Sequence, residues 1–217
     1  MYSKWVSIDE HVPTRRRQTR RESQQETRAR LIAAAIDLFA DAGVSATSLH
    51  AVAEHAGYSR GAVHGNFADK GELARAVADA VAGELAPELD RILRADGPSG
   101  ERLAGYIRAF IGYCAEQPRG ARALVAVVTH LGRGDAGFYE ERVASSLDGL
   151  VGLFEEGQRR GEMRDFDPRI MAFGLRTVLD AAAARRGGEA PAHLAEELVG
   201  LFDAATCAGA LPATGVR

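Results

Sequence analysis

The hydrophobic residues of this chain recur at steps of three and four along most of its length, which is the spacing of amphipathic α-helices. The first stripe comprises Leu31, Ala35, Leu38, Phe39 and Ala42. Ser23 and Glu26 have the spacing of a capping box ahead of it, and Gly43 favours a helix end behind it. The pattern therefore predicts a first helix from about residue 23 to Gly43.

Two short helices are predicted next, separated by a turn that contains glycine. Thr47 or Ser48 is the expected N-cap of the first helix, and Gly57 ends it. Ser59 is the expected N-cap of the second. Two short helices joined in this way form a helix-turn-helix, here over about residues 48–67. The positions expected in its core are Leu49, Val52, Val63 and Phe67.

A long fourth helix begins behind Asp69, where Glu72 stands at the reciprocal capping position. Pro87 interrupts it and predicts a kink. Beyond residue 100 the pattern gives five more helices and no strand, and Asp167, followed by Pro168, is the expected N-cap of one of these helices. The predicted fold class is therefore all-α, with an N-terminal three-helix domain that contains the helix-turn-helix. The long fourth helix joins this domain to a second helical domain.

Composition is that of a soluble globular protein, with 26% charged and 46% hydrophobic residues. Two cysteines are too few for a disulfide framework, so a reducing cytoplasm is expected. No run approaches the length of a membrane-spanning helix, so no membrane partner is expected.

Charge is distributed unevenly along the chain. Residues 15–30 hold seven arginines and two glutamates, although the whole chain carries a net charge of −3. A basic head on an acidic body indicates contact with a polyanion, and a solvated arm is equally consistent with it. We divide the chain into a flexible basic arm (1–22), a DNA-binding domain (23–85), a ligand-binding and dimerisation domain (86–210) and a flexible tail (211–217).

Two cations, Arg60 and Lys70, directly follow the expected N-caps Ser59 and Asp69. A cation in the first turn of a helix loses about 0.3–1 kcal/mol to the helix dipole. The penalty reverses when a phosphate or base edge lies in front of the helix end. Either residue alone is consistent with an ordinary surface position, but the pair inside a helix-turn-helix favours DNA binding.

Residues 27 to about 85 closely resemble the N-terminal domain of the TetR family of bacterial transcriptional regulators. The matching residues include Thr27, Arg28, Ala34, Ala35, Leu38, Phe39, Gly43, Thr47, Ala53, Ala56, Gly57, Ser59, Gly61, Phe67, Lys70 and Leu73. The resemblance implies a cytoplasmic DNA-binding regulator, associated with the nucleoid when bound. It implies a homodimeric repressor that a small molecule releases from a palindromic operator. It implies no enzymatic activity and no cofactor.

The resemblance also implies roles for single residues. Arg60, Gly61 and Ala62 open the recognition helix in the major groove, where Arg60 is suited to read guanine. Asn66 reads adenine or contacts phosphate, and Tyr58 contacts the DNA backbone or only fills the turn. Phosphate contacts are expected from Thr47, Ser48 and Lys70. The full predicted DNA-binding set is Thr47, Ser48, Tyr58, Ser59, Arg60, Gly61, Ala62, His64, Asn66 and Lys70.

His64 departs from the family pattern, which has a tyrosine at this position. An imidazole N–H can also donate to phosphate, and it does so better when protonated. Operator affinity is then expected to rise between about pH 7.5 and 6 more than in a His64→Tyr variant. The alternative is that His64 only packs. His50, Glu54 and His55 lie on a short helix whose open face would meet DNA, so no metal site is expected there.

The second domain offers two further sets of candidates. Aromatic and histidine residues that could line an effector pocket are Tyr106, Phe110, Tyr113, His130, Phe138, Phe154 and Phe173. Residues expected at a dimer interface in the last two helices are Ala181, Ala184, Leu198, Leu201 and Ala205. Aromatic residues at helical spacing can equally be core, and alanine richness can reflect helix propensity alone.

Two other classes of protein are alternatives to a DNA-binding regulator for an all-helical chain. An all-helical enzyme would need a nucleophile or a paired acid and base, and the sequence has no glycine-rich phosphate loop, serine elbow or cysteine–histidine spacing. A helical interaction protein without operator binding is the third class. The caps and cations from Ser59 to Lys70 argue against it.

Overall fold

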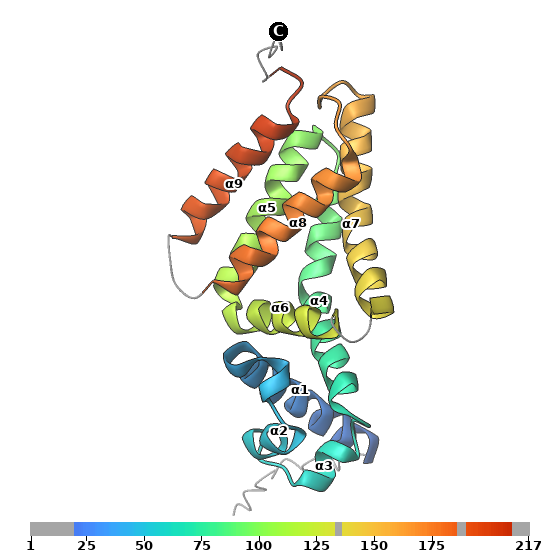
Figure 1. Ribbon diagram of the computed structural model, residues 1–217, viewed down its shortest axis with the longest axis vertical. Helices are drawn as coiled ribbons and strands as arrows, with labels where there is room; N and C mark the ends of the chain where they lie inside the picture. The colour runs from blue at the N-terminus through green and yellow to red at the C-terminus, as the bar shows by residue number, and fades with distance from the viewer. Residues whose placement is uncertain (1–19, 133–135, 186–189, 210–217) are drawn as a thin grey trace, which may run out of the picture.

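A computed structural model describes residues 20–132, 136–185 and 190–209, with side chains described for 21–132, 147–185 and 190–209. Within these residues the fold is entirely helical (Figure 1). The helices are α1 (Arg20–Ala46), α2 (Leu49–His55), α3 (Arg60–His64), α4 (Lys70–Leu93), α5 (Ser99–Glu116), α6 (Pro118–Leu131), α7 (Ala136–Arg159), α8 (Pro168–Ala184) and α9 (Pro191–Thr206). The all-α prediction is confirmed.

The first helix starts earlier than the sequence indicated. α1 begins at Arg20, and Ser23 lies inside it with its carbonyl oxygen accepting a hydrogen bond from the Thr27 hydroxyl at 2.9 Å. The predicted capping box at Ser23 is therefore wrong, because the helix continues upstream of it. The break at Gly43 is confirmed, with φ 80° and ψ 166° inside the last part of α1. Most of the predicted arm, residues 1–19, lies outside the described residues, as do residues 210–217.

Three predicted caps are formed by their side chains. The Ser48 hydroxyl accepts from the amide of Ala51 at 3.0 Å, so Ser48 is the N-cap of α2. Asp69 accepts from the amide of Glu72 at 2.7 Å and starts α4. Asp167 caps α8 by accepting from two amides at 2.9 and 3.0 Å. α4 continues through Pro87, which is exposed.

Two hydrophobic cores divide the molecule into a small lower and a large upper part in Figure 1. The lower core is formed by α1 to α4, and the upper core, the body, by α5, α7, α8, α9 and the second half of α4. α4 contributes Leu73 and Val77 to the lower core, and Leu85 and Leu89 to the body. None of the described helices is long and apolar enough to cross a membrane.

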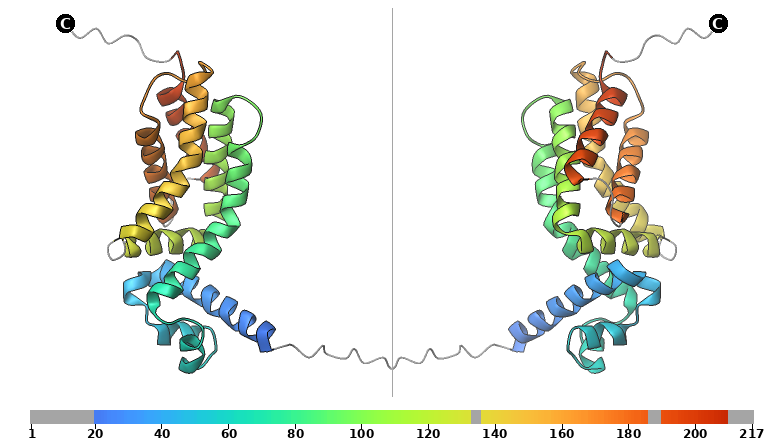
Figure 2. Two further views of the ribbon diagram at one scale, coloured as in Figure 1. Left: turned by 90° about the vertical axis from the view of Figure 1, so that its right-hand side faces the viewer. Right: turned by 90° about the vertical axis from the view of Figure 1, so that its left-hand side faces the viewer.

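α6 lies between the two cores and belongs to both. Its residues Ala123, Val127 and Leu131 are buried in the lower core, whereas Ala121 is buried in the body core and Val125 packs against it. Among the described helices, α6 and α1 form the most extensive contact, and both views of Figure 2 show them stacked across the waist of the molecule. The lower core is thus completed by a helix that the sequence assigned to the second domain.

Candidate nucleic-acid interface

The helix-turn-helix lies at one end of the molecule, with α2 and α3 at the bottom of Figure 1. Val52, Val63 and Phe67 are buried and anchor the two short helices on α1 and α4. Gly57 ends α2 with φ 74°, a conformation that favours glycine. Leu49 is half-buried against the same core, so the four predicted core positions are confirmed.

The N-terminal end of α3 presents polar and small residues to solvent. Ser59, Arg60, Gly61 and His64 are exposed and Ala62 is half-buried. Ser59 occupies the N-cap position without a side-chain capping bond. Arg60 forms no ion pair with any residue that the structure describes. α3 has five residues, so the dipole argument made for Arg60 is weaker than for a long helix.

Hydrogen bonds within the chain offset the unfavourable interaction of the Lys70 ammonium with the dipole of α4. Its ammonium donates to the carbonyl oxygens of Ser45 and Thr47, both at 3.1 Å. These carbonyls stand at the end of α1, where a cation is favoured. An ammonium group has three donors, so one N–H of Lys70 is left for a phosphate oxygen.

Thr47 and Ser48 differ in exposure. Thr47 is 4% exposed, and its hydroxyl donates to the carbonyl of Gly43 at 2.8 Å. Its amide donates to Val44 at 3.3 Å, so both of its donors are used inside the chain. The phosphate contact of Thr47 remains a prediction, which the burial of its side chain disfavours. Ser48 is exposed and keeps its predicted place at the surface.

Asn66 forms hydrogen bonds within the chain through its side chain and its carbonyl group. Its side-chain amide donates to the carbonyl of Ala62 at 2.8 Å, which closes the end of α3. Its own carbonyl accepts from Arg28 Nη1 at 2.7 Å. Both interactions hold Asn66 on the protein, and its contact with adenine or phosphate remains a prediction. Tyr58 packs half-buried against the lower core, in agreement with a role in filling the turn.

Polar contacts join α6 to α1 and, through α1, to the helix-turn-helix. Arg119 lies 2.9 Å from Asp37 and 3.2 Å from Asp41 of α1. The other carboxylate oxygen of Asp37 lies 3.5 Å from His55 Nε2, at the end of α2. One carboxylate therefore touches both α6 and the helix-turn-helix.

At the other end of α6, His130 Nδ1 lies 3.1 Å from the hydroxyl of Ser45, whose carbonyl accepts from Lys70. His130 thus faces α1, and its place in an effector pocket remains a prediction. Sequence patterns gave no signal for this contact, because its partners are 85 residues apart.

The other predicted pocket residues do not converge on one cavity. Tyr106, Phe110 and Phe154 are buried in the body core, and the Phe154 ring meets Phe166 edge-on at 5.5 Å. The hydroxyl of Tyr113 donates to Glu84 at 3.1 Å on α4. Phe173 is 56% exposed on α8 of the single chain, and its place in an effector pocket remains a prediction. The side chain of Phe138 lies outside the described residues.

A guanidinium is enclosed among these aromatic residues. Arg176 of α8 lies 2.9 Å from Asp180 and stacks over the Phe110 ring at 5.2 Å. Burial raises the pKa of the Tyr106 hydroxyl beside it, an effect that the charge of Arg176 reduces. Burial also raises the pKa of the neighbouring Cys114 thiol to about 11. The body core therefore contains one charged pair beside Tyr106.

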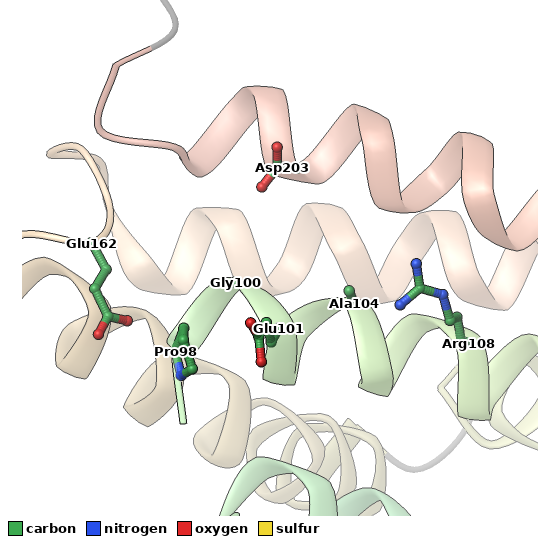
Figure 3. A pocket seen from close by; sticks show the side chains of 7 residues that line it. All are labelled: Pro98, Gly100, Glu101, Ala104, Arg108, Glu162 and Asp203. Carbon is green, nitrogen blue, oxygen red and sulfur yellow. The ribbon is translucent and has the colours of Figure 1, made fainter. Parts of the chain in front are cut away.

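The groove in Figure 3 has a different character from the predicted aromatic pocket. It encloses about 610 Å³ between the start of α5 and α9. Carboxylates of Glu101, Glu162 and Asp203 line it, together with Arg108. Arg108 is held by a two-bond ion pair with Glu196 at 2.7 and 2.8 Å. None of the predicted pocket residues lines this groove.

The outer faces of α8 and α9 carry unusually exposed apolar side chains. Ile170 and Phe173 of α8 and Leu201 of α9 are 71%, 56% and 57% exposed. Ala181 and Ala184 continue the α8 stripe, and Ala205 is half-buried. Leu198 is 8% exposed and packs in the body core, which disfavours its predicted interface position. α8 lies on the near side of the body in Figure 1 and α9 lies at its left-hand side, as the side views in Figure 2 also show.

The part of the chain that contains the helix-turn-helix matches a known protein family. Residues 31–77 match the model described as bacterial regulatory proteins, tetR family. The HTH-type transcriptional regulator TtgR of Pseudomonas putida is 45% identical over 61 residues. This match covers 28% of the present chain and 29% of TtgR. Sequence similarity to this relative is thus confined to the part that contains the helix-turn-helix.

Solved structures extend the likeness to the body. A bacterial regulatory protein in the tetR family from Rhodococcus RHA1 superposes with a TM-score of 0.73 at 21% identity. It covers 81% of this chain and 94% of the Rhodococcus chain. AibR in complex with isovaleryl coenzyme A and operator DNA gives a TM-score of 0.71 at 17% identity, covering 81% and 97% of the two chains. At these identities the likeness establishes the fold.

Proposed function

The N-terminal domain of this chain belongs to the tetR family of bacterial regulatory proteins, and on that premise we propose that the protein is a sequence-specific transcriptional repressor. The observation that carries the proposal is the exposed start of α3. It presents Arg60, Gly61 and His64 from a helix whose opposite side is locked by Val63 and Phe67. A short exposed helix on a rigid support suits the major groove.

Within this proposal each exposed residue has a chemical role. Arg60 donates in bidentate fashion to a guanine edge, and Gly61 lets the backbone approach the duplex. Ser48 and Ser59 donate hydroxyl hydrogens to phosphate oxygens. Lys70 uses its remaining N–H in the same way, while its other two donors fix it on α1. Thr47 and Asn66 also have structural roles, because their side chains form hydrogen bonds within the chain.

A selection of bound fragments from the source genome, followed by affinity measurement on the selected operator, tests the proposal. Arg60→Ala is expected to weaken operator binding by about 1–3 kcal/mol, while binding to a scrambled duplex changes far less. Arg75→Ala, on α4, is a control for loss of a nearby positive charge. If wild-type protein binds operator and scrambled DNA equally at all salt concentrations, the proposal fails in favour of a helical interaction protein.

We further propose that the protein acts as a two-fold homodimer through α8 and α9. The stripe of Ile170, Phe173, Ala181 and Ala184 leaves large apolar area in water, and a matching copy would bury it. Phe173→Asp places a charge in the centre of this surface and should yield monomers in sedimentation experiments. Thr129→Asp, at an exposed position on α6, is the matched control. Dimers of Phe173→Asp at micromolar concentration would count against this interface.

Release of DNA by a small-molecule effector is the remaining part of the proposed function. It is supported by the position of α6, which contributes buried residues to both cores. A ligand that shifts α6 would alter the support of α1 and, through Asp37, of α2. A compound that stabilises the body and weakens operator binding would identify the effector. Stabilisation without any change in operator affinity would contradict release.

A further inference from the structure

The contacts that fix the orientation of α3 support a further inference, which rests on the proposed function. α3 has five residues, and no side chain caps its N-terminal end. A helix this short has little stability of its own. Its orientation must therefore come from contacts made elsewhere, and the most specific of these lie at its C-terminal end.

Arg28 of α1 reaches this end across 38 positions of sequence. Its Nη1 donates to the carbonyl oxygen of Asn66 at 2.7 Å, and its guanidinium carbon lies 4.2 Å from the centroid of the Phe67 ring. Glu72 of α4 lies 3.7 Å from the same nitrogen. This one side chain of α1 thus contacts both the turn behind α3 and the first turn of α4.

The partners of Arg28 are themselves fixed. Phe67 is 1% exposed in the lower core. Glu72 accepts from the amide of Ala68 at 2.8 Å, so its carboxylate holds the turn between α3 and α4. Asn66 closes α3 through its bond to Ala62. Arg28 therefore closes a connected set of contacts, each of which begins or ends in the turn behind the recognition helix.

Arginine is specific for this position. A planar guanidinium can stack on a ring and donate in its own plane at the same time. A lysine ammonium would retain the charge beside Glu72 but could not form both contacts in one geometry. The charge and the shape of Arg28 can therefore be tested separately.

We infer that Arg28 is a positioning residue for operator recognition. It fixes the C-terminal end of α3 against α1, and so sets the angle at which Arg60 and Gly61 meet the base edges. It acts through the turn and does not contact DNA. Because non-specific binding needs phosphate contacts only, a changed angle should cost affinity for the operator more than for other DNA.

The test compares Arg28→Lys and Arg28→Met with Arg30→Met, a control at a neighbouring position on α1. Arg30 pairs only with its helix neighbour Glu26 among the described residues and its side chain is 62% exposed. Affinities for the selected operator and for a scrambled duplex are measured between 50 and 200 mM salt. Amide hydrogen exchange of free protein is followed in residues 60–67.

Both Arg28 variants should lower the ratio of operator to scrambled affinity by about tenfold or more, with an unchanged salt slope. Exchange in residues 60–67 should quicken, and Arg30→Met should leave the ratio and the exchange unchanged. The inference is overturned if Arg28→Met weakens both duplexes equally, reduces the salt slope by about one and is rescued by lysine, because that result identifies a phosphate contact.

Failure of the proposed function would be recognised separately. If wild-type protein shows no operator preference, repression by this chain is rejected while the exchange measurement still decides the positioning role. Faster exchange at residues 60–67 in Arg28→Lys, with α2 unchanged, supports it. Unchanged exchange in both α2 and α3 rejects it. Should Arg28→Met fail to fold, the lysine variant, which keeps the charge and the aliphatic stem, provides the same comparison.

Discussion

The burial of Val127 in the lower core predicts that α6 stabilises α1 and the helix-turn-helix. Val127 of α6 is fully buried among residues of α1 and α4, although α6 is joined covalently to the body. Val125, two positions earlier on the same helix, packs against the body core. The same substitution at these two positions therefore perturbs different cores.

Val127→Ala removes two methyl groups from a buried site. At about 0.8 kcal/mol for each, with a further cost for the cavity left behind, the loss is about 2 kcal/mol. This corresponds to roughly thirtyfold in the opening equilibrium of the helices that Val127 supports. Val125 is half-buried, so Val125→Ala should cost about half as much, and its effect should appear in the body.

Amide hydrogen exchange resolves where the stability is lost, because separate regions open with separate free energies. In Val127→Ala, protection should fall in α1 and α2 while α8 and α9 change little. In Val125→Ala the order should reverse. An equal loss throughout the molecule in both variants, or a loss confined to α8 and α9 in Val127→Ala, would refute the assignment of α6 to the lower core.

Three further predictions follow from single residues. Cys114, whose pKa burial raises to about 11, should resist alkylation at pH 8, whereas the exposed Cys207 reacts first; intact mass after timed labelling checks this, and faster labelling at Cys114 would contradict its burial. The pKa of Glu162 is lowered by the hydrogen bond from the Ser99 amide, so its contribution to stability is present above the ordinary carboxyl pKa of about 4.3 and is lost as pH falls through the lowered value. The gap in Tm between wild type and Glu162→Gln should therefore close on acidification below about pH 4, and a gap that persists at pH 2 would contradict it. For His64, the operator affinities of wild type and His64→Tyr should diverge between about pH 7.5 and 6, and parallel profiles would show that the imidazole does not contact phosphate.

Local signals in the sequence were the reliable ones. Asp69 and Asp167 cap their helices as predicted, and Gly43 and Gly57 take the positive φ expected of helix ends. Each signal depends on neighbours within a few residues, so the chain itself contains the information. Ser23 shows the limit of such motifs, since its capping-box spacing occurs inside a helix that had already begun at Arg20.

Contacts between distant segments could not be predicted in this way. Lys70 bonds to carbonyls 23 and 25 residues away, and His130 meets Ser45 across 85 residues. α8 has two apolar stripes, one through Leu175 and Leu179 and one through Phe173, and the sequence does not say which of them faces inward. The prediction placed Phe173 inside for this reason, whereas the structure buries the other stripe.

The position of α6 also determines where this chain can be divided into separate modules. The lower core includes Val127 and Leu131, and Arg119 adds two ion pairs to α1. A chimera could be made by cutting α4 after residue 85 and joining the N-terminal segment to the body of another protein. In this chimera α1 would pack against a foreign helix. When modules are exchanged between proteins of this fold, α6 must therefore be transferred together with α1 to α4. Otherwise the residues of α6 that pack against α1 must be introduced into the corresponding helix of the recipient.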